Sequence, residues 1–61
     1  MNYSYEYSVY DHDNAESREY NTLDEARATA KKWKAKGHRV ELTYEKVDLD
    51  GNVETIKSYS I

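Results

Sequence analysis

Two imidazoles, His12 and His38, are the side chains in this chain best suited to acid–base chemistry near neutral pH. Neither stands at a recognisable spacing from a nucleophile, and no glycine-rich phosphate loop accompanies them. A chain of 61 residues also leaves little room for a concave pocket that excludes water. We therefore expect two surface histidines, no catalytic residues and no enzymatic activity.

Asp48, Asp50 and Asn52 have the spacing that opens an EF-hand calcium loop. The sixth position of such a loop requires glycine but is Val53, and the twelfth requires glutamate but is Tyr59. We interpret this stretch as the turn of a β-hairpin, because it contains the Asp-Gly pair favoured in tight turns.

A second acidic group consists of Asp11, Asp13 and Glu16. These carboxylates could hold a divalent ion weakly, but nothing in their spacing fixes a coordination geometry. The chain has no cysteine, which removes disulfides and the usual zinc sites. We expect neither a metal nor another cofactor.

Cations concentrate in residues 26–39, which contain six lysines and arginines and no acid. Arg27, Lys31 and Lys34 lie near one side of a helical wheel, so a basic helix over 27–39 could contact nucleic-acid phosphates. Lysines on other sides spread the charge, and cations near a helix C-terminus also complement its dipole. Because the whole chain carries a net charge of −3, nucleic-acid binding is the alternative interpretation.

These cations belong to a predicted helix. Thr22-Leu23-Asp24-Glu25 has the pattern of a capping box, and Gly37 suits the left-handed position after a helix. Between them, apolar side chains recur at helical spacing: Leu23, Ala26, Ala30 and Trp33. The pattern predicts a helix over 23–36. We expect Trp33 to pack on one of three strand residues: Tyr5, Val40 or Leu42.

Alternating apolar and polar residues predict four strands, at residues 2–10, 16–20, 39–47 and from 53 to 59 or 61. Asp13-Asn14 and Asp50-Gly51 supply the two hairpin turns. The result is one domain over residues 1–61 with an α+β fold, a single helix packed on a four-stranded antiparallel sheet in the order β-β-α-β-β. The two most regular strands belong in the middle, which gives the spatial order 2-1-3-4.

The segments "EYNTLDEA", "KGHRVEL" and "DLDGNVE" lie between residues 16 and 56 and carry the capped helix and the glycine turn. In these segments the chain resembles small uncharacterised domains of bacteria and phages that have a β-β-α-β-β order. The resemblance implies the same fold and carries no catalytic residues to transfer. We expect a bacterial or phage source.

Tyrosines alternate with polar residues in the first strand, where Tyr3, Tyr5 and Tyr7 share a face. Such a face could stack nucleic-acid bases, but a stacking surface needs interleaved lysines or arginines, and the intervening residues are serine and glutamate. The chain has no phenylalanine, so its core needs these rings beside Trp33. We expect Tyr3, Tyr5, Tyr7 and Tyr44 to turn toward the helix.

The opposite sheet face is then acidic and rich in hydroxyl groups. We expect it to bind an unidentified protein of basic character through four residues: Glu6, Tyr10, Glu41 and Glu45. A face that simply meets water is the alternative. The expected function is non-enzymatic protein binding, as a small regulator or inhibitor. No apolar run is long enough for a signal sequence or a membrane span, so we expect a soluble cytoplasmic protein without membrane contact.

Two registers are open for the last hairpin. A two-residue turn at Asp50-Gly51 pairs Leu42 with Tyr59 and turns Tyr59 and Ile61 toward the helix. A three-residue turn pairs Tyr44 with Ile56 and moves four apolar residues to the outer face: Val47, Val53, Tyr59 and Ile61. The second register would expose enough apolar surface for a homodimer through the outer sheet face.

Overall fold

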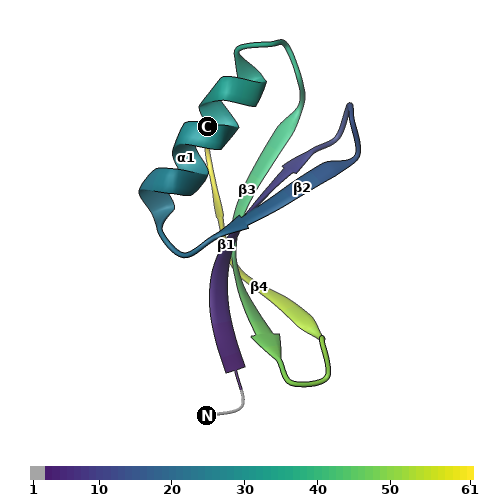
Figure 1. Cartoon of the computed structure of the whole chain (residues 1–61), viewed down its shortest axis with the longest axis vertical. Coiled ribbons are helices and arrows are strands. Elements are labelled where there is room, and N and C mark those ends of the chain that lie inside the picture. Colours follow the sequence, from purple (N-terminus) through teal and green to yellow (C-terminus); the bar gives the residue numbers. More distant parts are fainter. Residues whose placement is uncertain (1–2) are drawn as a thin grey trace.

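The structure, a computed structural model, describes residues 3–61, and this part of the chain forms four strands and one helix (Figure 1). Their bounds are β1 Tyr3–Asp11, β2 Glu16–Tyr20, α1 Leu23–Lys34, β3 Val40–Asp48 and β4 Val53–Tyr59. The strands form one antiparallel sheet in the order β2-β1-β3-β4. The predicted α+β fold and its strand order are confirmed. Asn2, the predicted start of the first strand, lies outside the described residues.

Local hydrogen bonds explain both ends of α1. The Thr22 hydroxyl accepts a hydrogen bond from the Glu25 backbone N–H (3.3 Å), so the predicted N-cap forms. The Glu25 carboxylate reaches back as predicted but accepts from the Thr22 hydroxyl (2.9 Å), whereas a capping box uses the backbone N–H of the N-cap residue. The helix stops at Lys34 and not at the predicted Lys36, because Lys36 and Gly37 donate to carbonyls three residues back and tighten the last turn. Gly37 has the expected left-handed conformation, with φ of +86°.

The core is small and lies between α1 and the sheet. Its buried apolar side chains are Val9, Ala26, Ala30, Trp33 and Leu42. Partly buried residues pack around them: Tyr7, Tyr20, Leu23, Val40, Tyr59 and Ile61. Trp33 therefore packs in one cluster with Val40 and Leu42, as predicted, whereas Tyr5 does not belong to that cluster.

The helix covers only part of the sheet. A 12-residue helix is about 18 Å long, whereas the nine-residue strands β1 and β3 extend for about 30 Å. Figure 1 shows the strands continuing well beyond the helix. We call this uncovered part, residues 3–6, 44–48 and 53–57, the open end of the sheet.

The prediction of a four-tyrosine core is wrong for two of the rings. Tyr3 and Tyr5 lie on the helix side of the sheet, but they fall in the open end and remain 48% and 47% exposed. Tyr7 packs against the core. Tyr44 connects the two regions, since its ring centroid lies 4.6 Å from that of Tyr7 and 5.8 Å from that of Tyr5.

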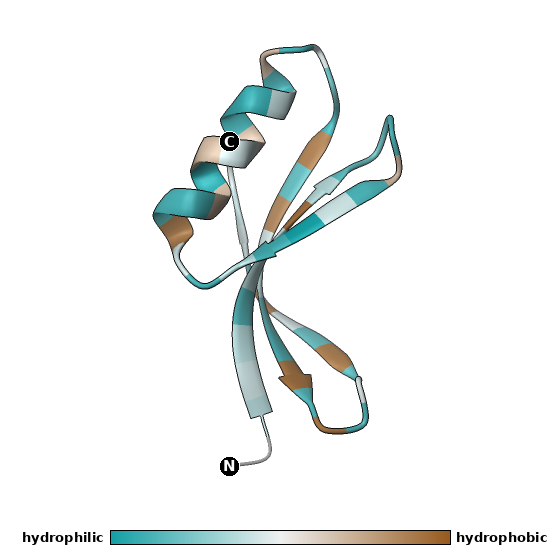
Figure 2. Cartoon of the chain, viewed as in Figure 1, coloured by the Kyte–Doolittle hydropathy of each residue, from teal (hydrophilic) through white to brown (hydrophobic). Residues whose placement is uncertain are grey.

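A β-bulge gives the last hairpin both of the predicted registers. Next to the turn, Val47 pairs with Val53, as a three-residue turn requires, and beyond the bulge Leu42 pairs with Tyr59, as a two-residue turn requires. The extra residue is Ile56. The bulge therefore leaves Val47 and Val53 on the face away from α1 and returns Tyr59 to the core side. Figure 2 shows the apolar segments of β3 and β4 beside this turn.

Candidate functional site

The four residues predicted to bind a partner lie on one face of the sheet. Glu6 of β1 is opposite Glu45 of β3, and Tyr10 of β1 is opposite Glu41 of β3. These positions alternate with those of the core residues, so they lie on the face away from α1. We call this the outer face. The structure thus groups all four residues on the surface where the sequence predicts them.

Glu6 is surrounded by other carboxylates on the outer face. Glu45 is directly opposite, and Glu19 of β2 pairs with Ser8, the next outward residue of β1. Burial raises the pKa of Glu6, and the charges of Glu19 and Glu45 raise it further. Like charges held opposite one another destabilise a sheet, so this cluster does not serve the fold. Sequence reasoning missed Glu19, because its neighbours depend on how β2 pairs with β1.

Charge is divided between the two faces of the sheet. The cations within the strands are Arg18, Lys46 and Lys57, and the pairings place all three on the helix side. Among the strand residues that the structure describes, the outer face carries glutamates and neither lysine nor arginine. The outer face therefore presents negative charge alone, whereas the helix side carries both signs.

An aromatic residue marks one end of the outer face. Tyr10 is 37% exposed, and its ring meets the His12 ring edge-on with 4.7 Å between centroids. His12 Nε2 in turn lies 2.9 Å from Glu41 Oε1. These contacts fix a ring and a carboxylate side by side at the surface, an arrangement that suits an incoming cationic or apolar side chain.

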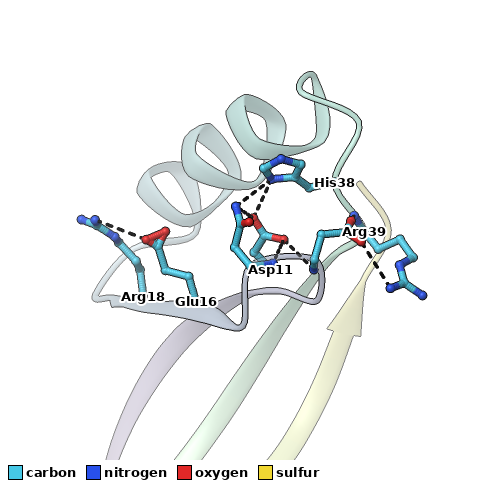
Figure 3. Close-up of polar contacts among 7 residues, drawn as sticks. Asp11, Glu16, Arg18, His38 and Arg39 are labelled. Carbon is cyan, nitrogen blue, oxygen red and sulfur yellow. Dashed lines mark hydrogen bonds and ion pairs between the residues drawn. The ribbon is translucent and has the colours of Figure 1, made fainter.

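A buried carboxylate anchors the turn between β1 and β2 (Figure 3). Asp11 is only 1% exposed, and its Oδ1 accepts hydrogen bonds from the backbone N–H groups of Asp13 (2.9 Å) and Asn14 (3.2 Å). His38 Nδ1 donates to its Oδ2 at 2.6 Å. Burial raises the pKa of Asp11, but the hydrogen bonds from His38 and the two backbone groups outweigh burial, so this pKa lies below its ordinary value.

Further contacts join the same turn to the segment before β3. Asp13 accepts one hydrogen bond from the Arg39 backbone N–H (2.6 Å) and another from its guanidinium (3.3 Å), and both lower the pKa of Asp13. The His12 backbone N–H donates to the Arg39 carbonyl at 2.8 Å. We call this region, residues 11–15 and 35–40, the closed end of the sheet.

Of the two histidines expected at the surface, His38 is partly buried. Its side chain is 24% exposed and is hydrogen-bonded to Asp11, 27 residues away in sequence. Only the pairing of β1 with β3 brings Asp11 and His38 together, so their spacing in the sequence could not predict this contact. A carboxylate that orients an imidazole also occurs in acyl-transfer triads. Here His38 donates its Nδ1 proton to Asp11, and Asn14 Nδ2 lies 3.4 Å from the same ring nitrogen, so the ring joins two loops.

The acidic residues considered as a weak cation site do not converge on a common point. Asp11 and Asp13 are engaged as described above, and Glu16 lies 3.9 Å from the Arg18 guanidinium (Figure 3). Within residues 3–61, no group of three or more histidine, cysteine or carboxylate side chains is arranged to hold a metal ion.

The cations of the alternative nucleic-acid site, Arg27, Lys31 and Lys34, are exposed along α1. Lys34 Nζ donates a hydrogen bond to the main-chain carbonyl of Ile61, so one of the three is engaged within the chain. The helix that the structure describes within residues 3–61, α1, is neither long nor apolar enough to cross a membrane.

The chain matches no family model, no curated protein and no solved structure. The resemblance to bacterial and phage domains is therefore still a prediction. The function is therefore inferred from the surfaces of the molecule itself.

Proposed function

We propose that this chain is a non-enzymatic protein-binding module whose outer face binds a basic protein surface. One observation carries the proposal: the outer face gathers four glutamates, and its described strand residues include neither lysine nor arginine. The four are Glu6, Glu19, Glu41 and Glu45. A surface of one sign attracts partners of the opposite sign and accelerates their encounter.

Two further features support binding at this face. The Tyr10 ring is held against His12, so it would lose little side-chain freedom when it meets a partner, and exposed tyrosines often contribute strongly to interfaces. The raised pKa of Glu6 reflects, after burial, repulsion from Glu19 and Glu45. A partner's lysine or arginine placed among these carboxylates would relieve that repulsion.

Within this proposal the chain acts as a small regulator or inhibitor that covers a basic site of its partner, in the cytoplasm of a bacterium or a phage-infected cell. Nucleic-acid binding through Arg27, Lys31 and Lys34 is the alternative. That alternative requires affinity that falls steeply with salt and depends on the helix cations.

The test compares three forms of the chain in co-purification from the native host, followed by titration of the captured protein. One variant reverses the outer face with Glu6→Lys, Glu41→Lys and Glu45→Lys. A control makes the same change in net charge elsewhere with Glu16→Lys, Asp24→Lys and Asp50→Lys. We expect both variants to keep the circular dichroism of the original chain. The outer-face variant should lose at least about tenfold in affinity, and the control should lose much less.

Full affinity of the outer-face variant for the captured protein would contradict this proposal. So would a native partner that proves to be a nucleic acid whose binding depends on Lys31 and Arg27. Equal losses in both variants would show that only net charge matters, and this too would remove the outer face as a specific site.

A further inference from the structure

The open end leaves aromatic and apolar surface uncovered on the helix side. Tyr3 and Tyr5 are 48% and 47% exposed, and the Tyr44 ring stacks beside that of Tyr5. Ile56, the extra residue of the β4 bulge, is 47% exposed at the same end. Exposed aromatic and apolar side chains gathered at one end of a sheet are typical of a protein contact.

Unlike the outer face, this surface carries both signs of charge. Lys46 of β3 lies between Tyr5 of β1 and Glu54 of β4 in the strand pairing, and its ammonium lies 3.8 Å from the centroid of the Tyr3 ring. A two-fold rotation places the same surface of a second copy in the opposite direction. Lys46 of one copy can then meet Glu54 of the other, so the surface is complementary to itself.

The outer face lacks this property. Two copies meeting there would oppose glutamate to glutamate without a strand cation between them among the described residues. The outer-face homodimer expected from the sequence also required exposure of Tyr59 and Ile61, and both pack against the core. Val53 is also apolar and 56% exposed on the outer face, but the glutamates of that face have no strand cation to meet among the described residues. Of the two sheet surfaces, the helix side of the open end therefore suits self-association better.

The outline of the chain fits such a pairing. The molecule has two layers where α1 lies and one layer at the open end (Figure 1). Sheets pack face to face about 10 Å apart, which is close to the thickness of a helix, about 10–12 Å with its side chains. If two copies pack with antiparallel long axes, the one-layer open end of each copy therefore lies beside the helix of the other, where it completes a second layer.

Lysines beside tyrosines also describe a platform for single-stranded nucleic acid. Bases stack on free ring faces, but each of these rings already has a neighbour within the chain. Tyr5 and Tyr44 stack with their planes 17° apart, Tyr44 packs on Tyr7 with centroids 4.6 Å apart, and Lys46 lies over Tyr3. Glu54 also lies opposite Lys46 in the strand pairing and repels phosphate, so this surface suits a protein better than a nucleic acid.

We propose that two copies of this chain form a two-fold dimer through the helix side of the open end. Each copy buries the rings of Tyr3 and Tyr5 against the other, and Lys46 of each copy contacts Glu54 of the other. The outer face stays free in the dimer, so two sites for the basic partner point away from each other.

The test measures the mass of the full chain by sedimentation equilibrium over a wide concentration range. The mass should rise from 7.2 kDa toward twice that value. Lys46→Glu and Glu54→Lys each leave like charges on the surface, so either variant should weaken the dimer at least about tenfold. An equimolar mixture of the two variants should associate again, because a copy with two acids then meets a copy with two cations.

Two controls accompany this experiment. Lys31→Glu on α1 makes the same change in net charge as Lys46→Glu and should leave the dissociation constant nearly unchanged. Tyr5→Ser keeps every charge and removes one exposed ring, so it should weaken the dimer even if a charge variant folds poorly.

Several results would overturn the proposal. A wild-type chain that remains at 7.2 kDa at every concentration has no such dimer. A dimer that withstands both charge variants, or a mixture of them that stays monomeric, uses another surface. Binding of oligothymidylate to a monomeric chain, with dependence on Tyr5, would assign the surface to nucleic acid.

Discussion

The two hairpin turns are built alike but lie in different surroundings. Asp11 and Asp48 each accept hydrogen bonds from two backbone N–H groups of their own turn, and each also binds the side chain of an asparagine in that turn. Asp11 is buried beside His38, whereas Asp48 stands at the open end and is only partly buried. One local motif thus closes both turns, and the difference between them comes from what packs around each.

The same contrast extends to the two ends of the sheet. Toward the closed end, α1 packs on the strands, and the segment before β3 forms hydrogen bonds with the turn between β1 and β2. At the open end, the described contacts are those between neighbouring strands, as in the ring pair Tyr5 and Tyr44. Matched substitutions at the two ends should therefore have unequal effects on the free energy of unfolding.

The largest difference should come from the aromatic residues. Trp33→Ala empties the centre of the core and should cost about 3–5 kcal/mol. A single core in so small a domain rarely supplies more than about 3–5 kcal/mol, so this variant should be unfolded at room temperature. Tyr5→Ala removes a ring that is half exposed and should cost less than about 1 kcal/mol.

Urea unfolding followed by circular dichroism, at a concentration where the chain is monomeric, measures both effects. Equal losses for the two variants would contradict the division of the sheet into a part covered by α1 and an open end. A native tryptophan emission like that of free tryptophan in water would also contradict it, because Trp33 is only 8% exposed.

A smaller difference is expected between the two turn acids. The pKa of Asp11 in the folded chain lies below its ordinary value of 3.8. The ionised form therefore stabilises the fold fully above that ordinary value, and this contribution is lost as the pH falls through the lower folded-state value. Hydrogen bonds from Asn52 lower the pKa of Asp48 in the same direction.

Asn replacements separate the two contributions. Asp11→Asn keeps the shape of the side chain but loses the charge beside His38, so its stability should be lower at neutral pH and should depend less on acidification. Asp48→Asn should have a weaker effect, because this side chain keeps contact with solvent. The urea unfolding midpoints of both variants and of the original chain, measured from pH 7 to pH 2, test this difference. An Asp48→Asn effect as large as that of Asp11→Asn would show that burial beside His38 adds nothing.

The sequence predicted the elements that depend on neighbouring residues. The Thr22 cap, the alternation in β1 and β3, and the glycine turn are local signals, and each appears in the structure. It did not predict features that depend on distance across the fold. The Asp11–His38 contact requires the pairing of β1 with β3, and Glu19 joins the outer face only through the register of β2.

The tyrosine error has the same origin. Alternation correctly placed Tyr3 and Tyr5 on the helix side, but it does not say how far along the strand the helix reaches. Likewise, the choice between two registers for β4 had no single answer, because a bulge at Ile56 lets each register apply to one half of the strand. The four outer-face residues could be predicted because their grouping needs only alternation and one strand pairing.

The smallest expected effects come from the backbone of the two turns and should have opposite signs. Ala15 has a left-handed conformation, with φ of +52°, and Gly51 has φ of +85° with open space where a Cβ would be. A residue with a Cβ loses roughly 1–2 kcal/mol of folding free energy in the left-handed conformation. Glycine avoids this loss but lowers stability by about 0.4–1 kcal/mol, because its unfolded chain has more conformational freedom. Ala15→Gly should therefore stabilise the fold by about 0.5 kcal/mol. Gly51→Ala should destabilise it by about 1 kcal/mol, since its φ is farther from the left-handed minimum.

Urea unfolding of both variants and of the double variant tests this pair. Because the turns lie at opposite ends of the sheet (Figure 1), the two changes should add to within about 0.5 kcal/mol. A stabilising Gly51→Ala, or an Ala15→Gly that destabilises, would mean that the backbone conformation is not what distinguishes these positions. The contacts around each turn would then decide the sign of the change, and the two turns would differ through their surroundings alone, as Asp11 and Asp48 do.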